Sequence, residues 1–74
     1  MEKHSVVITG HATSFSLEPE FWTYLKQIAT EQDISVTHLI ERIDNARRTN
    51  LSSAIRVYVL KSLAEKVVKN EKAE

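Results

Sequence analysis

The feature that most constrains the fold is a short segment in which large apolar residues alternate with small ones. The large residues are Phe15 and Leu17, and the small ones are Ala12, Ser14 and Ser16. This period of two predicts a half-buried β-strand over residues 12–17. A lone strand has unpaired N–H and C=O groups along both edges and is unstable, so this strand requires a partner.

Two partners for this strand follow from the sequence. Residues 5–9 (S-V-V-I-T) are mostly β-branched and could form an arm or a strand that folds back through a tight turn at Gly10-His11. The same strand of a second subunit is the alternative. A chain of 74 residues buries only about 60% of its unfolded surface, and it has neither Cys nor a paired His spacing for a structural metal. This marginal core favours the second subunit, and therefore a homodimer.

Three helices are predicted after the strand. They span residues 19–32, 36–48 and 51–69. Pro19 suits the first turn of a helix, and Asp33 suits the left-handed residue that ends one. Ser35 and Asn50 are the expected caps of the second and third helices. The third helix is apolar on more than one side, which predicts that it is sandwiched between elements or subunits. We expect one mainly α domain over residues 1–74 with a short N-terminal β-strand.

Charge is unevenly distributed, although the formal net charge is zero. Residues 18–34 carry four acidic residues against one lysine, residues 35–50 carry three arginines against two acids, and residues 51–74 carry five basic residues against three acids. A neutral chain is unusual for a nucleic-acid binder. No segment approaches the roughly 18 apolar residues that cross a bilayer, and no secretory leader is evident. We expect a cytoplasmic protein that has no membrane contact.

The sequence gives little support to catalysis. Ser, His and Asp all occur, yet nothing matches a nucleophile elbow, a phosphate-binding loop or a dinucleotide fingerprint. A chain of this size also leaves little room for a substrate pocket. We expect no enzymatic activity, no catalytic residue, no cofactor and no metal.

The small face of the strand indicates nucleic-acid binding. A solvated strand face more often carries Lys, Glu or long polar side chains, whereas Ser allows close approach and can donate to or accept from base edges. A two-stranded ribbon also fits the major groove of B-DNA, which is about 12 Å wide. Ala12, Ser14 and Ser16 are therefore the predicted base-contacting residues, and a plain solvent-exposed face is the alternative.

A longer pattern surrounds this strand. It consists of T-S-F-S-L-E-P-E-F-W from Thr13, Leu25, Ile28-Ala29, Ile34-Ser35-Val36 and Leu39-Ile40. The pattern resembles the ribbon-helix-helix proteins related to the Arc and MetJ repressors. The runs G-H-A-T-S-F-S-L-E and N-L-S-S-A-I-R-V-Y-V-L look like a group of short bacterial proteins with ribbon-helix-helix domains. The resemblance implies an intertwined ribbon-helix-helix homodimer with an additional C-terminal helix.

The resemblance also implies site residues. Family members hold a DNA phosphate through amide N–H groups at the start of the second helix, at positions that match Ser35, Val36 and Thr37. The implied shared dimer core consists of Phe15, Leu17, Leu25, Ile28, Val36, Leu39, Ile40 and Ile43. Two positions depart from the pattern: Ala12 stands where the group often has Arg, and Asp33 stands where relatives often have Gly.

These inferences predict a homodimer that binds double-stranded DNA in a sequence-specific way by inserting an antiparallel two-stranded ribbon into the major groove. Its expected role is that of a small, nucleoid-associated transcriptional regulator. The alternative is a dimeric protein-interaction module or an antitoxin that binds a partner protein through its third helix. The neutral charge and Ala12 favour the alternative, whereas the small hydroxyl face and the Ser35 cap favour DNA. Arg47, Arg48 and Arg56 are either a basic lobe beside DNA or simply solvated helix ends.

Overall fold

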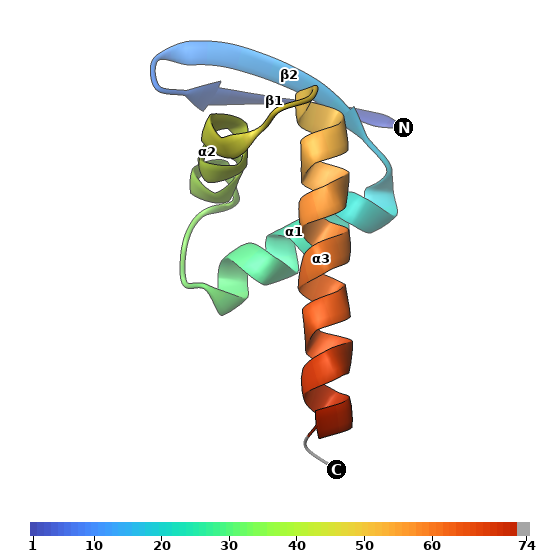
Figure 1. The fold of residues 1–74 in the computed structure, drawn as a ribbon. Helices are drawn as coiled ribbons and strands as arrows, with labels where there is room; N and C mark the ends of the chain where they lie inside the picture. Colours follow the sequence, from blue (N-terminus) through green and yellow to red (C-terminus); the bar gives the residue numbers. More distant parts are fainter. Residues whose placement is uncertain (73–74) are drawn as a thin grey trace.

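The computed structural model describes the backbone of residues 1–72 and the side chains of residues 1–67. A β-hairpin lies across one end of a group of helices (Figure 1). In chain order the elements are β1 (Glu2–Ile8), β2 (His11–Leu17), α1 (Pro19–Glu31), α2 (Val36–Ala46) and α3 (Leu51–Lys72). The later half of α3 extends beyond the other elements. No helix in the described part of the chain is both long and apolar enough to cross a membrane.

The two strands pair with each other within one chain. They are antiparallel, and the register runs from Glu2 opposite Leu17 to Ile8 opposite His11. Of the two forms left open for residues 5–9, an arm or a strand, the structure has the strand, and β1 is as long as β2. The expectation of one short N-terminal strand is therefore wrong. Closing a hairpin through a short loop costs little chain entropy and requires no second subunit.

The turn of the hairpin is Thr9-Gly10, one residue earlier than the predicted Gly10-His11. Both residues have positive φ, 49° at Thr9 and 79° at Gly10. This is the pattern of a two-residue type I′ turn, whose twist matches that of the paired strands. Gly adopts positive φ readily, but a β-branched residue rarely does. Because such turns usually carry Asn-Gly or Asp-Gly, the Thr at this position weakens the sequence signal for the hairpin and for the exact place of its turn.

α1 begins at Pro19 and ends in a Schellman motif. The N–H of Ile34 donates to the carbonyl of Ala29 at 3.0 Å, and the N–H of Asp33 donates to the carbonyl of Thr30 at 3.0 Å. Asp33 is left-handed, with φ 58°, which is the conformation that the sequence predicts for it. The helix itself stops at Glu31, one residue before the predicted end.

α2 and α3 each begin at a side chain that caps the helix. The Ser35 hydroxyl accepts a hydrogen bond from the N–H of His38 at 3.0 Å. The Asn50 side-chain oxygen accepts one from the N–H of Ser53 at 2.9 Å. Each cap satisfies one of the N–H groups that a helix start leaves free, so both predicted caps are confirmed.

α2 ends at Ala46 rather than at the predicted residue 48. Arg47 leaves the helix in an extended conformation, with φ −72° and ψ 149°. Its side chain then donates to Asp44 at 2.6 Å and to the carbonyl of Thr49 at 2.8 Å, which fixes the turn into α3. α3 continues to Lys72, three residues beyond its predicted end.

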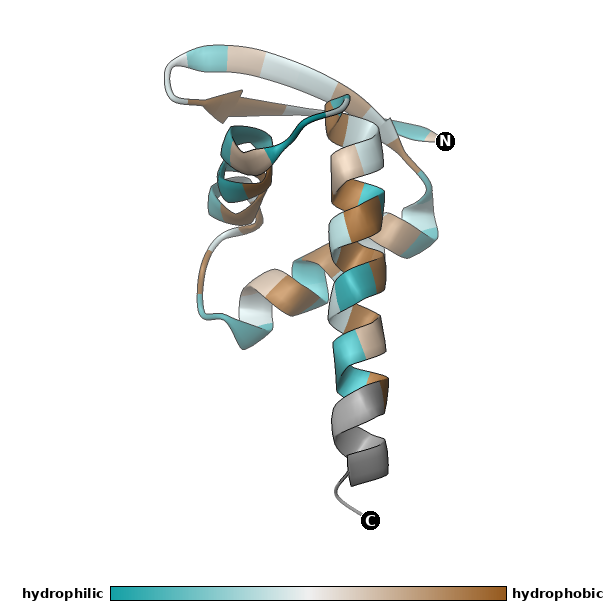
Figure 2. Cartoon of the chain, in the orientation of Figure 1, coloured by the Kyte–Doolittle hydropathy of each residue, from teal (hydrophilic) through white to brown (hydrophobic). Residues whose placement is uncertain are grey.

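One chain closes a hydrophobic core between the underside of the hairpin and the three helices. The buried residues are Ile8, Phe15, Leu17, Leu25, Ile28, Ala29, Leu39, Ile40, Ile43, Leu51, Ile55 and Val59. Figure 2 shows apolar residues in both strands and in all three helices, interspersed with polar ones. The core positions implied by the family resemblance are all in this set except Val36, which packs against it partly buried. β1 and α3 thus complete within one chain the core that the resemblance divides between two.

An aromatic stack holds β1 against α1. The His4 ring stacks on Trp22, with centroids 3.9 Å apart and planes 16° apart. The same His4 ring lies 5.5 Å from the ring of Phe15 on β2. These contacts fix the underside of the hairpin, so its other side keeps a defined orientation relative to the helices.

Candidate nucleic-acid interface

The outer face of the hairpin carries only short side chains and one lysine. Its opposite pairs are Lys3 with Ser16, Ser5 with Ser14, and Val7 with Ala12. All six residues are exposed. The predicted base-contacting residues Ala12, Ser14 and Ser16 therefore share a face with three residues of β1 that the sequence reasoning missed. The alternation in β1 is visible in the sequence, but its register against β2 is not.

The side chains of the outer face carry different chemical groups from one end of the hairpin to the other. At one end is the Lys3 ammonium group; in the middle the Ser5 and Ser14 hydroxyl oxygens lie 3.1 Å apart and share a hydrogen bond. At the turn end Val7 and Ala12 provide methyl groups. Lysine and hydroxyl groups can bond base edges, and apolar groups can contact the methyl of thymine. The two strands are about 4.8 Å apart, so this ribbon is narrow enough for a major groove.

The start of α3 lies beside this face. A groove of about 470 Å³ is lined by Lys3, Ser14, Phe15, Ser16, Asn50, Leu51 and Ser52. The groove thus combines a lysine, serine hydroxyls and the positive end of a helix dipole, which are groups that favour an anion such as phosphate. The sequence predicts Asn50 as a helix cap, but nothing in it indicates that this cap lies next to Ser14 and Ser16.

The predicted phosphate-contacting residues lie elsewhere. Ser35, Val36 and Thr37 form the start of α2, which the chain enters on the side away from the hairpin in Figure 1. No acceptor in the described part of the chain bonds to the N–H of Val36 or Thr37. None of the three residues lines the groove beside Ser14. Within one chain the structure therefore keeps the predicted base-contacting and phosphate-contacting residues apart.

Two of the three arginines considered for a basic lobe are held in ion pairs. Arg56 donates to both carboxylate oxygens of Glu18, at 2.8 and 3.3 Å. This bidentate hydrogen bonding lowers the pKa of the Glu18 carboxyl below its usual value. Arg47 is bonded to Asp44 at 2.6 Å. Arg48 alone of the three has no carboxylate partner among the described residues.

An antiparallel ribbon followed by helices is an arrangement found in proteins that read DNA with β-strands. The chain belongs to the ribbon-helix-helix domain family, whose model matches residues 1–63. Proteins of this family are generally DNA-binding transcriptional regulators or antitoxins, and they typically bind DNA as dimers. Comparisons with curated proteins and with solved structures found no match.

Proposed function

We propose that this protein is a sequence-specific DNA-binding protein, a small transcriptional regulator that places the β1–β2 ribbon in the major groove of double-stranded DNA. The observation that carries the proposal is the outer face of the hairpin, which is exposed, lacks carboxylates and carries Lys3, Ser5, Ser14 and Ser16. The protein acts by binding rather than by catalysis, in the cytoplasm and on the nucleoid.

The proposed assembly is a homodimer in which each protomer uses its own hairpin. Two hairpins joined edge to edge would form four strands whose outer members lie about 14 Å apart, wider than the groove of about 12 Å. Two separate hairpins instead match the half-sites of a two-fold symmetric sequence. Lys3 and the start of α3 contact the phosphates nearest the ribbon.

Cysteine substitution tests which strands pair. Ser5→Cys combined with Ser14→Cys should give a disulfide within one chain, because the two hydroxyl oxygens are only 3.1 Å apart. Ser14→Cys alone should stay monomeric on a non-reducing gel. Rapid formation of a covalent dimer by the single variant would show that β2 pairs with its twin, and would overturn the use of separate hairpins.

Removing the serine hydroxyls tests sequence reading. Ser14→Ala with Ser16→Ala should flatten the sequence preference measured by selection from a random duplex library, because the hydroxyls are the groups offered to base edges. Thr23→Ala with Thr30→Ala is the matched control, since both hydroxyls bond only to carbonyls of α1. No binding of any duplex by the unaltered protein at about 50 mM salt would overturn the proposed function.

The second candidate function is protein interaction, as in an antitoxin. The observation that favours it is the exposed apolar surface of α3. Val57, Leu60 and Val67 are 47%, 64% and 56% exposed although they are large hydrophobic residues. An exposed apolar patch of this kind is typical of interaction sites.

A further inference from the structure

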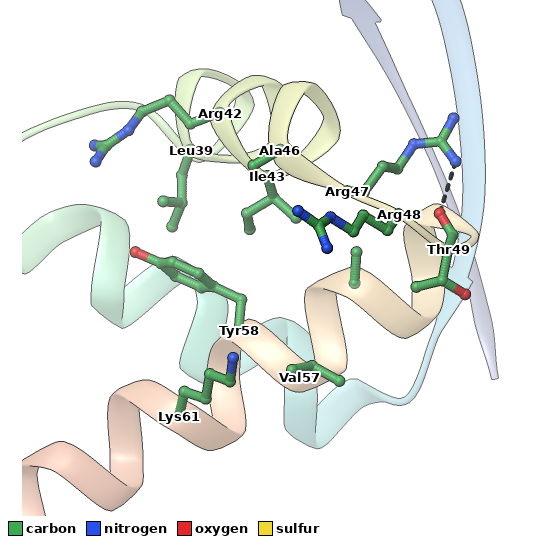
Figure 3. Close-up of a pocket in the computed structure, with 11 residues that line it drawn as sticks. Leu39, Arg42, Ile43, Ala46, Arg47, Arg48, Thr49, Val57, Tyr58 and Lys61 are labelled. Atoms are coloured by element: carbon green, nitrogen blue, oxygen red, sulfur yellow. Dashed lines mark hydrogen bonds between the residues drawn. The ribbon is translucent and has the colours of Figure 1, made fainter.

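A groove between α2 and α3 has an apolar floor. It encloses about 620 Å³, and the helices place Leu39, Ile43, Ala46, Ala54 and Val57 along it (Figure 3). Tyr58 lies at one side of the same space. The groove is on the helical side of the core, and none of the base-contacting candidates on the hairpin lines it. It is therefore a second surface, separate from the outer face of the hairpin.

The rim of this groove is positively charged. Arg42, Arg47, Arg48 and Lys61 line it, and no carboxylate does. Figure 3 shows Arg48 reaching over the space between α2 and α3. Arg42 donates to the side chain of Gln32, and Arg47 is bonded to Asp44. Within the described residues, Arg48 and Lys61 have no carboxylate partner, so their charges are available to a ligand.

An apolar stripe on α3 extends the groove. Val57, Leu60, Ala64 and Val67 are all exposed and follow one another at intervals of three and four residues, which places them on one helix face. This face lies opposite the buried face that contains Ile55 and Val59. The sequence predicted α3 to be sandwiched, but in one chain only one side is covered. An occupant of the groove and the stripe must be elongated and apolar along its length.

We propose that the groove and stripe bind an amphipathic helix of a partner protein that carries acidic residues on both sides of its apolar face. The apolar face would cover Ile43, Ala54 and Val57, and the acidic residues would pair with Arg48 and Lys61. A helix in an apolar groove is a recurrent mode of recognition, and complementary charge selects the partner and its register. This inference names the partner class for the second candidate function and does not rest on DNA binding.

A second copy of this chain fits the groove less well. Its most acidic segment is residues 18–34, but two acids of that segment are already bonded within the chain, Glu18 to Arg56 and Glu31 to Lys66. On the exposed face of α1, Tyr24 is the single large apolar residue and lies beside Glu20 and Gln27, so α1 offers no apolar stripe. DNA also fits less well, because phosphates would leave the apolar floor uncovered.

Two synthetic peptides test the proposal with the intact protein. Both are about 18 residues long, enough to form a helix, and share one leucine stripe; one has Glu and the other Lys on both flanks. We expect the Glu peptide to bind at least about tenfold more tightly than the Lys peptide in fluorescence anisotropy. Equal affinity for the two peptides, or no binding of the Glu peptide, would overturn the proposal.

Charge reversal in the protein makes the test specific to the groove. Lys61→Glu combined with Arg48→Glu should weaken the Glu peptide about tenfold and strengthen the Lys peptide. Lys26→Glu, an exposed lysine of α1 outside the groove, is the matched control for Lys61→Glu and should leave both affinities unchanged. Equal effects at Lys26 and Lys61 would show only a response to net charge and would contradict the proposal.

Val57→Asp distinguishes the remaining occupants. Val57 is about half exposed, so its replacement should preserve the circular dichroism spectrum and abolish binding of the Glu peptide. If Val57→Asp instead converts a dimer to a monomer in light scattering, and the Glu peptide fails to bind the unaltered protein, the groove holds a second copy. If Lys61→Glu weakens duplex DNA binding and neither peptide binds, the rim is a DNA surface. Either result overturns the proposal. The proposed function is tested separately, by the DNA-binding assay on Ser14→Ala with Ser16→Ala.

Discussion

The outer face of the hairpin and the groove between α2 and α3 are built over the same hydrophobic core, but they present different side chains. The hairpin offers short residues, hydroxyls and Lys3, whereas the groove offers an apolar floor with four cationic side chains. Neither surface contains a carboxylate. Three acidic residues are held in ion pairs, Glu18–Arg56, Glu31–Lys66 and Asp44–Arg47, and only the last of these pairs involves a residue of the groove rim. A net charge of zero therefore describes neither surface, and it is a weak argument against an anionic partner.

The largest expected difference between the two regions is in stability. Phe15→Ala removes a ring that is only 5% exposed beneath the hairpin, and should lower the free energy of unfolding by about 3–5 kcal/mol. Val57→Ala, on the floor of the groove, should change it by less than about 0.5 kcal/mol because the side chain is half exposed. Urea unfolding monitored by Trp22 fluorescence measures both. Equal losses would mean that the floor of the groove is covered in solution.

The next largest effect concerns reading by the hairpin. Ala12→Arg should tighten binding to a preferred duplex by about 1–3 kcal/mol, because arginine can make a bidentate bond to guanine in the major groove. It should not alter the affinity of the α2–α3 groove for the Glu peptide. Asn45→Arg adds the same charge at an exposed position of α2 and is the control. An equal gain from both variants would indicate attraction to phosphate rather than reading of bases.

A smaller effect is expected at the turn that positions the outer face. Thr9→Asn should stabilise the protein by about 1 kcal/mol, because Asn tolerates positive φ better than a β-branched residue. Gly10→Ala should act in the opposite direction, because an L side chain is strained at φ 79°. Nothing lies within 4 Å of the added methyl, so the loss comes from the backbone alone and not from a clash. Thermal unfolding measures both, with Thr30→Asn on α1 as the control. A loss of stability in Thr9→Asn would contradict the type I′ assignment.

The smallest effect is a dependence on pH. Because Arg56 lowers the pKa of Glu18 in the folded state, this pair contributes stability above the ordinary carboxyl value of 4.5, and the contribution disappears as the pH falls through the lowered pKa. Urea unfolding between pH 6 and pH 3 should therefore show a loss that Arg56→Gln reduces. An identical pH profile in Arg56→Gln would mean that the pair contributes nothing in solution.

Local signals in the sequence were sufficient for much of the fold. Pro19 marks the start of α1, Asp33 marks the left-handed end of the same helix, and Ser35 and Asn50 cap the following helices. Each of these residues acts on backbone groups within a few positions of itself. Alternation likewise revealed β2, because the period of the side chains depends on the strand alone.

The remaining features depend on which segments meet, and single residues do not encode that. The sequence leaves residues 5–9 open as an arm or a strand, because Thr9-Gly10 lacks the usual turn residues of a hairpin. Lys3 and Ser5 were therefore not recognised as neighbours of Ser16 and Ser14. The groove between α2 and α3 was missed for the same reason: Arg48 and Lys61 are far apart in sequence, and only the packing of two helices places them on one rim.

Because the ribbon closes within one chain, the amount of ribbon depends on protein concentration differently from that of a ribbon shared by two chains. A ribbon assembled from two chains exists only after they associate, so at low concentration its amount rises with the square of the protein concentration. A ribbon formed by β1 and β2 is present in every folded chain. Under the proposed function, occupancy of a DNA half-site should then rise in simple proportion to protein concentration at low occupancy, and any cooperativity between half-sites should come from contacts made by the helices.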